Sequence, residues 1–147
     1  MLIMARDRSY SELQKALKNK KVFIWTCNTC VKMCYGLGGT ESAERLGKKL
    51  REDGIDVKGV LSVSAACLES KILLKVEEVE NSKSDIILAL MCSVGARCAE
   101  KVFGMSVINP VNTFGFGYLS IDHGPVLTSE GKEKKLSDLS DLSTPFV

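Results

Sequence analysis

Hydrophobic positions along the chain switch repeatedly between a helical and an extended pattern. Apolar residues recur every three or four positions, the spacing of amphipathic helices, in segments 9–19, 40–53, 68–79 and 96–103. Short runs rich in β-branched and aromatic residues predict strands at 21–26, 57–63, 85–91 and 106–108. Beyond Thr113 the pattern weakens, with one further strand expected near 118–121 and a turn at Asp122–Pro125.

Residues at the ends of two predicted helices support these boundaries. Ser9 and Glu12 have the Ser-x-x-Glu spacing of a capping box, in which the serine side chain and the glutamate satisfy free backbone N–H groups. Gly54 follows the second helix, where a left-handed residue commonly ends a helix. We therefore expect the first helix to begin just after Ser9 and the second to stop before Gly54.

The order of the predicted elements indicates an α/β fold. Strands and helices alternate with short connections, which predicts a three-layer, Rossmann-like domain with a mainly parallel sheet and right-handed crossovers. The near-continuous apolar run at 85–91 suits a strand that is buried on both faces. We predict a single domain over 1–147, with an α/β core at 21–116 and a polar peripheral tail at 129–147.

Composition narrows the functional classes. The chain has 147 residues, 45% of them hydrophobic and 26% charged, with a net charge of +2 and no basic cluster of the kind that nucleic-acid binding requires. The longest apolar run, 86–92, is too short to span a membrane, and the start lacks the apolar stretch of a secretory signal. The sequence thus predicts a soluble, cytoplasmic protein that binds neither nucleic acid nor membrane.

Six cysteines against a single histidine are the most informative feature of the composition. Cys27, Cys30 and Cys34 follow the first predicted strand of the core, Cys67 follows the second and Cys92 ends the third. Because parallel strands end at one edge of a sheet, and ligands bind there, we expect these five thiols to converge. Four thiolates suit zinc or an iron–sulfur cluster, so the sequence predicts a metal site at the carboxyl edge of the strands.

Other residues near the cysteines have candidate roles. Gly36, Gly38 and Gly39 follow the cysteine-rich segment, and we expect Gly38 and Gly39 to help bind the cofactor by bringing backbone amides close to the sulfurs. Cys98, inside a predicted helix, is expected to be a core residue. Cys27 and Cys30 also form a Cys-x-x-Cys pair, which leaves a redox dithiol as a further hypothesis.

Five spaced elements of the chain match the pattern of a known family: Thr26–Cys34 (TCNTCVKMC), Gly38-Gly39, Cys67, Leu90–Gly95 (LMCSVG) and Val107–Thr113 (VINPVNT). Over 21–116 the chain thereby resembles the cysteine-rich C-terminal domain of methylenetetrahydrofolate reductases. This family also occurs as a small accessory subunit of heterodimeric methylenetetrahydrofolate reductases in anaerobic one-carbon metabolism. The chain departs from the family in two respects: no cysteine follows Cys98, and Ser93 stands where glycine is usual.

The resemblance implies a non-catalytic accessory subunit rather than an enzyme that acts alone. It implies a [4Fe–4S] cluster, or alternatively zinc, on the thiols of Cys27, Cys30, Cys34, Cys67 and Cys92. It also implies a partner, either a flavoprotein oxidoreductase that performs the folate chemistry or a methyl-transfer subunit. A structural zinc-binding module and a thiol redox protein are the alternative functions. Which four thiols bind the metal is left open by the sequence.

Overall fold

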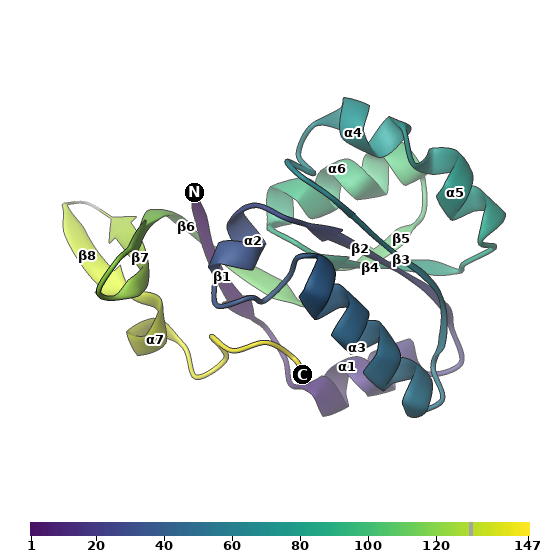
Figure 1. Ribbon diagram of the computed structural model, residues 1–147, viewed down its shortest axis with the longest axis horizontal. Coiled ribbons are helices and arrows are strands. Elements are labelled where there is room, and N and C mark those ends of the chain that lie inside the picture. Colours follow the sequence, from purple (N-terminus) through teal and green to yellow (C-terminus); the bar gives the residue numbers. More distant parts are fainter. Residues whose placement is uncertain (130) are drawn as a thin grey trace.

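The computed structural model, which describes residues 1–129 and 131–147, shows an α/β protein with two β-sheets (Figure 1). In the described residues, one sheet is parallel with strand order β3-β2-β4-β5, and the other is antiparallel with order β1-β6-β7-β8. The strands are β1 Leu2–Arg6, β2 Lys21–Cys27, β3 Asp56–Val63, β4 Ile86–Leu90, β5 Ser106–Ile108, β6 Val111–Ser120, β7 Gly124–Ser129 and β8 Lys132–Lys135. The helices are α1 Tyr10–Leu17, α2 Cys30–Met33, α3 Thr40–Glu52, α4 Glu69–Leu73, α5 Val76–Asn81, α6 Ser93–Phe103 and α7 Leu136–Leu139.

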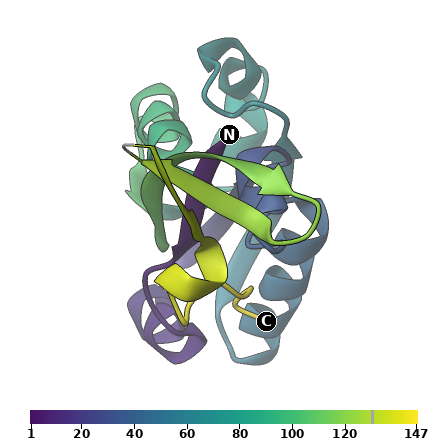
Figure 2. The same cartoon turned by 90° about the vertical axis from the view of Figure 1, so that its left-hand side faces the viewer.

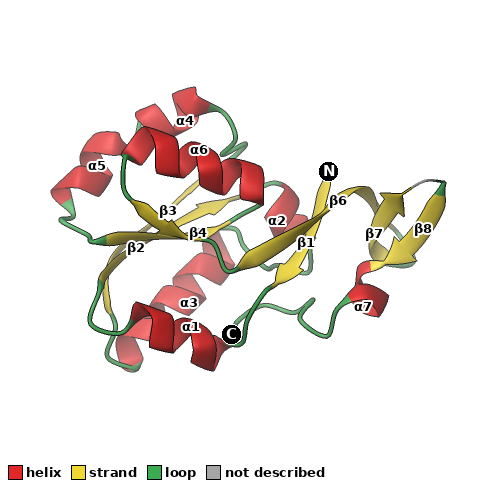
Figure 3. Cartoon of the chain, turned by 180° about the vertical axis from the view of Figure 1, so that it is seen from behind, coloured by secondary structure: helices red, strands yellow, loops and turns green. Residues whose placement is uncertain are grey.

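Helices cover both faces of the parallel sheet (Figures 1 and 3). Helices α1 and α3 pack on one face through Leu13, Leu17, Leu46 and Leu50, all of them buried. Helices α4, α5 and α6 lie over the other face, where Ile72, Val79 and Phe103 contribute to a second buried cluster. The parallel strands predicted from the hydrophobic pattern are therefore present, and the two central ones, β2 and β4, are buried on both faces.

The predicted helix ends are confirmed, and one predicted helix is divided. Ser9 and Glu12 form the complete capping box of α1, and Gly54 follows α3 with a φ of +86°. The helix expected over 68–79 forms two short helices, α4 and α5. The stripe of Leu68, Ile72, Val76 and Val79 that predicted one helix is only partly buried: Ile72 and Val79 are buried in α4 and α5, and Leu68 is exposed.

The antiparallel sheet is the main difference between the predicted and the observed fold. The sequence predicted one mainly parallel sheet. Strand β1, at the start of the chain, pairs with β6 more than 100 residues later, and β6 begins at Val111 rather than near 118. Such distant pairing leaves no mark in the local pattern of either segment. Gly117 permits the close approach of β7, because a Cβ there would lie 1.9 Å from the carbonyl oxygen of Val126.

The polar tail predicted at 129–147 is docked, apart from residue 130, which lies outside the described residues. It contributes β8 and α7, which Figure 2 shows beside β7 at one end of the molecule, and its Leu136 is fully buried. Arg6 anchors the last segment: its backbone amide donates to the Leu142 carbonyl at 2.9 Å, and its side-chain Nε donates to that of Thr144 at 2.7 Å. The Arg6 guanidinium also lies 5.3 Å from the ring centre of Phe146.

Among residues 1–129 and 131–147, none of the helices has the length and apolar character that a membrane span requires.

Candidate functional site

Three neighbouring parallel strands end around one cavity. Strands β3, β2 and β4 are adjacent, and the loops at their carboxyl ends enclose a space of about 90 Å³. Four cysteines line it: Cys27, Cys30, Cys67 and Cys92. Most of the remaining wall is apolar, including Leu2 of β1, which closes the cavity from the antiparallel sheet. The structure therefore brings together four of the five cysteines that the sequence predicted at this edge.

Cys27 is the last residue of β2 and the most deeply placed of the four, with 8% of its surface exposed. Its Sγ lies 2.9 Å from the Thr29 Oγ1 and accepts a hydrogen bond from the backbone N–H of Ala66 at 3.5 Å. Ala66 belongs to the loop after β3, next to Cys67. The strand that carries one thiol is thus tied directly to the loop that carries another.

Cys92 caps the amino end of α6. Its Sγ accepts the backbone N–H of Gly95 at 3.4 Å, in the position where a helix also favours negative charge. Burial raises the pKa of the Cys92 thiol, hydrogen bonds from the amides of Gly95 and Val94 oppose that rise, and the nearby thiols of Cys30 and Cys27 add to it. The amides thus stabilise a thiolate in a cavity that otherwise disfavours charge.

Cys30 and Cys67 complete the ring of thiols. Cys30 is the first residue of α2, a helix of one turn within the segment that the sequence predicted to be a loop, and it is partly exposed. Cys67 lies in the loop between β3 and α4 and is exposed to solvent. These two thiols therefore form the solvent side of the cavity, and Cys27 forms its floor.

Two further cysteines lie outside the cavity lining. Cys34, predicted as a possible ligand, is fully buried against β1, where its Sγ donates to the Leu2 carbonyl at 3.7 Å. Burial raises the pKa of the Cys34 thiol to about 11, which keeps it protonated. Cys98 is partly buried on α6 and packs against the edge of the core, whereas the sequence predicted a core residue.

Gly38 and Gly39 have a packing role that the sequence did not predict. The Gly39 amide donates to the Thr26 Oγ1 at 2.9 Å rather than to a sulfur, and a Cβ on Gly38 would lie 2.9 Å from both the Thr26 Oγ1 and the Leu90 carbonyl oxygen. Successive residues of a strand point to opposite faces, so Thr26 and Cys27 lie on opposite sides of the sheet. The amides that reach sulfur instead belong to Ala66 and Gly95.

Asn109 and Thr113 support the site from the segment that joins the two sheets. With its amide nitrogen oriented toward β4, the Asn109 side chain donates to the carbonyls of Ala89 at 2.9 Å and Met91 at 3.1 Å. The Thr113 Oγ1 accepts the backbone N–H of Ser93 at 3.0 Å. These bonds hold the chain on both sides of Cys92. Both residues belong to the VINPVNT stretch of the resemblance, which assigned them no role.

The polar chemistry of the cavity comes mainly from thiols, since four of its lining residues are cysteines and most of the others are apolar. The described residues hold no group of three His, Cys, Asp or Glu side chains gathered closely enough for a single ion. Four thiols nevertheless surround one apolar cavity, and two of them already accept amide N–H bonds. Such bonds to sulfur are the outer interactions that stabilise anionic metal–thiolate centres.

Comparisons of the chain with protein-family models, with curated proteins and with solved structures give no match.

Proposed function

We propose that the chain binds a [4Fe–4S] cluster through Cys27, Cys30, Cys67 and Cys92. The observation that carries the proposal is the convergence of these thiols, from three loops, on one cavity. When bound, such a cluster supplies one-electron transfer, at a potential that depends on hydrogen bonds to sulfur and on burial. The parallel half of the molecule would then be a Rossmann-like unit that binds its ligand at the carboxyl edge of the strands.

The cavity between the thiols favours a cluster over a single zinc ion, because the described residues hold no gathered group of three ligands for one ion. Zinc–sulfur bonds of about 2.3 Å, arranged tetrahedrally, place the four sulfurs only about 3.8 Å apart. In a cluster each cysteine binds a different iron, so the thiols are distributed around a larger space. The cavity of about 90 Å³ between the four cysteines supports that arrangement.

The proposed role is electron transfer within an accessory subunit, paired with a flavin-dependent methylenetetrahydrofolate reductase or a related methyl-transfer enzyme. The resemblance noted in the sequence supports this choice of partner.

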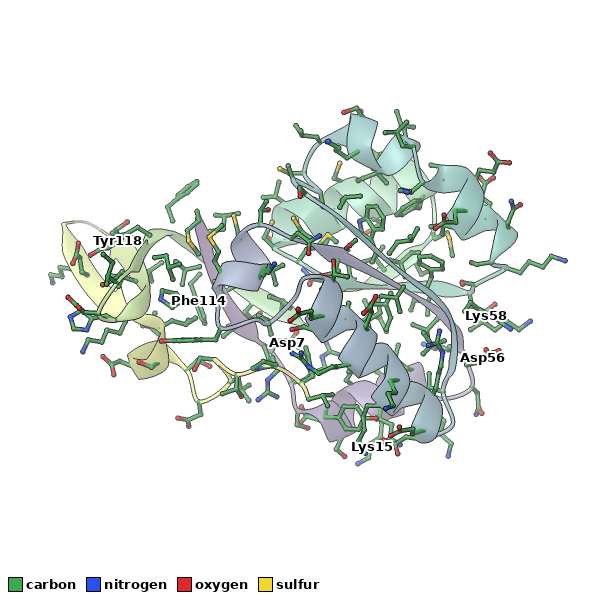
Figure 4. All side chains as sticks on the ribbon, in the orientation of Figure 1. Asp7, Lys15, Asp56, Lys58, Phe114 and Tyr118 are labelled. Atoms are coloured by element: carbon green, nitrogen blue, oxygen red, sulfur yellow. The ribbon has the colours of Figure 1, made fainter. Side chains whose placement is uncertain are left out.

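The structure supports a partner that approaches beside the cavity: Leu2, in the cavity wall, pairs with Phe116 of β6, which is 73% exposed. Phe114 and Tyr118, also on β6, lie at the end of the molecule away from Asp56 and Lys58 of β3 (Figure 4). A cytoplasmic location is part of the proposal, because thiols stay reduced there.

The test is metal analysis of protein purified without oxygen. We expect about four iron and four sulfide ions per chain, absorbance near about 400 nm that bleaches with dithionite, and an electron paramagnetic resonance signal in the reduced state. Fluorescence gives a second measurement, since Trp25, the only tryptophan, lies two residues before Cys27 on the same side of β2. Loading with iron and sulfide should quench it.

Matched variants locate the cluster. Cys92→Ser should remove most of the iron, and Cys98→Ser, on the same helix but outside the cavity, should retain it. Cys34→Ser should also retain iron. This result would show that Cys34, the fifth cysteine predicted as a ligand, does not bind the cluster. Stoichiometric zinc without iron, even after anaerobic reconstitution, would instead establish the zinc module. Protein that takes up neither metal would refute the site.

A further inference from the structure

Cys98 lies on α6 about one helical turn beyond Gly95, the last residue of that helix to line the cavity. Gly95 of α6 lines the cavity together with Cys67. Lys101, three residues beyond Cys98, forms an ion pair with Glu69 at 2.5 Å. Cys98 is three residues from both Gly95 and Lys101, and residues at this spacing share a helix face. The segment 67–69 therefore runs alongside α6, and Cys98 lies between the two contacts along the helix.

Exposure supports the pairing of the two thiols. Cys67 is exposed and Cys98 is partly exposed, so both are accessible to a small oxidant. Burial raises the pKa of the Cys98 thiol, and the charges of Glu69 and of the Cys67 thiol raise it further. The loop that carries Cys67 includes Ala65 at a positive φ of 54°.

We propose that Cys67 and Cys98 form a reversible disulfide when a peroxide oxidises the metal-free protein, and that this bond regulates loading of the site. The Cys67 thiolate attacks hydrogen peroxide, the O–O bond breaks, and the sulfur becomes a sulfenic acid as hydroxide leaves. The Cys98 thiolate then attacks that sulfur, the S–S bond forms, and the second oxygen leaves as water. Two thiols lose two electrons in total, and one peroxide is reduced to two waters.

The disulfide would remove one of the four cavity thiols. This regulatory consequence rests on the proposed function, because it requires Cys67 to be a ligand. Once Cys67 is paired with Cys98, a cluster cannot regain its full set of thiolates until a dithiol reductant opens the bond. Cys98 is outside the cavity lining, so its role is to pair with a ligand rather than to be one.

The experiment uses the double variant Cys27→Ser/Cys30→Ser, which keeps Cys67 and Cys98 but removes the competing Cys-x-x-Cys pair and two proposed ligands. The variant is treated with hydrogen peroxide, free thiols are blocked, and the protein is digested with trypsin without reduction. Cleavage after Lys58, Lys71, Arg97 and Lys101 places the two cysteines in separate peptides, 59–71 and 98–101. We expect mass spectrometry to find these peptides linked in most chains.

Two controls make the result decisive. Adding Cys98→Ala to the double variant should abolish the linked peptide and leave Cys67 as sulfenic or sulfinic acid. Far-ultraviolet circular dichroism of each variant confirms that it is folded. The inference is wrong if folded double variant yields oxidised Cys67 without a link to 98–101, or links Cys67 mainly to Cys92.

Wild-type protein then tests the regulation separately. In chains reconstituted with iron and sulfide, the disulfide should form at least about tenfold more slowly than in metal-free chains. Equal rates with iron bound would overturn the regulatory step, because Cys67 would then be free of the cluster. Failure to bind iron would overturn the proposed function, whereas the linked peptide in the double variant would still establish the disulfide.

Discussion

The two faces of the parallel sheet are both buried, but they are built from different chemistry. Within β2, Val22 and Ile24 point toward α1 and α3, and Phe23, Trp25 and Cys27 point toward α6. Strand β4 repeats the division, with Ile86, Leu88 and Leu90 on the first side and Ile87, Ala89 and Met91 on the second. We call the α1–α3 side the aliphatic face and the α6 side the thiol face. The sulfur atoms in Figure 4 lie near β1, α2, α4 and α6, in keeping with this division.

Polar groups distinguish the two faces as clearly as apolar ones. On the aliphatic face, the buried Thr26 hydroxyl donates to the Leu90 carbonyl at 2.8 Å and accepts the Gly39 amide, so its hydrogen bonds are satisfied. On the thiol face, the indole N–H of Trp25 is buried without a partner among residues 1–129 and 131–147. One face is closed and satisfied, while the other contains a cavity and a ring of thiols. We infer that the first stabilises the fold and the second binds the ligand.

The strongest test of this division is Leu88→Ala on the aliphatic face. Leu88 is fully buried, so its truncation should lower the free energy of unfolding by about 2–5 kcal/mol through lost burial and a new cavity. Urea denaturation measures the loss. The iron content of the folded protein should stay at the wild-type value, and iron lost from folded Leu88→Ala would show that the two faces are not independent.

Gly38→Ala tests whether Gly38 and Gly39 serve the packing of the fold or the binding of the cofactor. The added methyl group would lie 2.8 Å from Val31 Cγ1 and 2.9 Å from the Leu90 carbonyl oxygen, which is backbone and cannot move aside cheaply. We expect a loss of about 1–3 kcal/mol in the free energy of unfolding, with no change in iron stoichiometry. The matched control is Gly47→Ala within α3, where the nearest contact is a Val60 methyl group at 3.1 Å and the substitution should cost less.

Asn109→Asp tests whether the end of β4 must be held for Cys92 to bind metal. The aspartate keeps the size of the side chain but places carboxylate oxygen opposite the carbonyls of Ala89 and Met91, which need a donor. We expect the free energy of unfolding to fall by about 1–3 kcal/mol, and the cluster to be lost faster to a chelator. Asn112→Asp, on the exposed side of β6, is the control. Unchanged cluster stability would mean that Asn109 supports the strand only.

Local patterns predicted the parts of the molecule whose contacts are close in sequence or that follow from a general rule of sheets. The capping box at Ser9, the stop at Gly54, the strand that ends at Cys27 and the strand that precedes Cys92 belong to this group. The convergence of thiols was also predictable, because parallel strands end at a common edge. The role of Cys34 was not, since its burial depends on β1, which the sequence analysis did not recognise as a strand.

The antiparallel sheet marks the limit of that reasoning. The pairing of β1 with β6 and the docking of the tail by Arg6 join residues more than 100 positions apart, and no periodicity within either segment encodes them. The glycine pair was misinterpreted for a related reason: proximity to the cysteines in sequence does not place a residue on the same face of the sheet. Alternation along β2 sends Thr26 and Cys27 to opposite sides, and the glycines follow Thr26.

The smallest expected effect lies at the rim of the aliphatic face, between α1 and the end of α3. The Tyr10 hydroxyl donates to the Asp53 Oδ2 at 2.5 Å, and this bond lowers the pKa of the Asp53 carboxyl below its ordinary value of 3.8. A carboxyl whose pKa is lowered by folding stabilises the protein above its unfolded-state pKa, and this contribution is lost as pH falls through the folded-state value.

Tyr10→Phe removes the hydroxyl and should therefore raise the pKa of Asp53, as measured by nuclear magnetic resonance of the carboxyl carbon during titration. Its free energy of unfolding should fall slightly below that of the wild type at pH 7, and the two should converge at pH values below the ordinary aspartate pKa. Lys49 forms an ion pair with Asp53 at 3.4 Å in both proteins, so 0.5 M salt should weaken that pair equally and leave the difference caused by the hydroxyl. Iron content should not change, since the thiol face lies on the other side of the sheet. Tyr10→Phe is the mildest of these substitutions. A change in its iron content would therefore show that the aliphatic face and the thiol face are not independent.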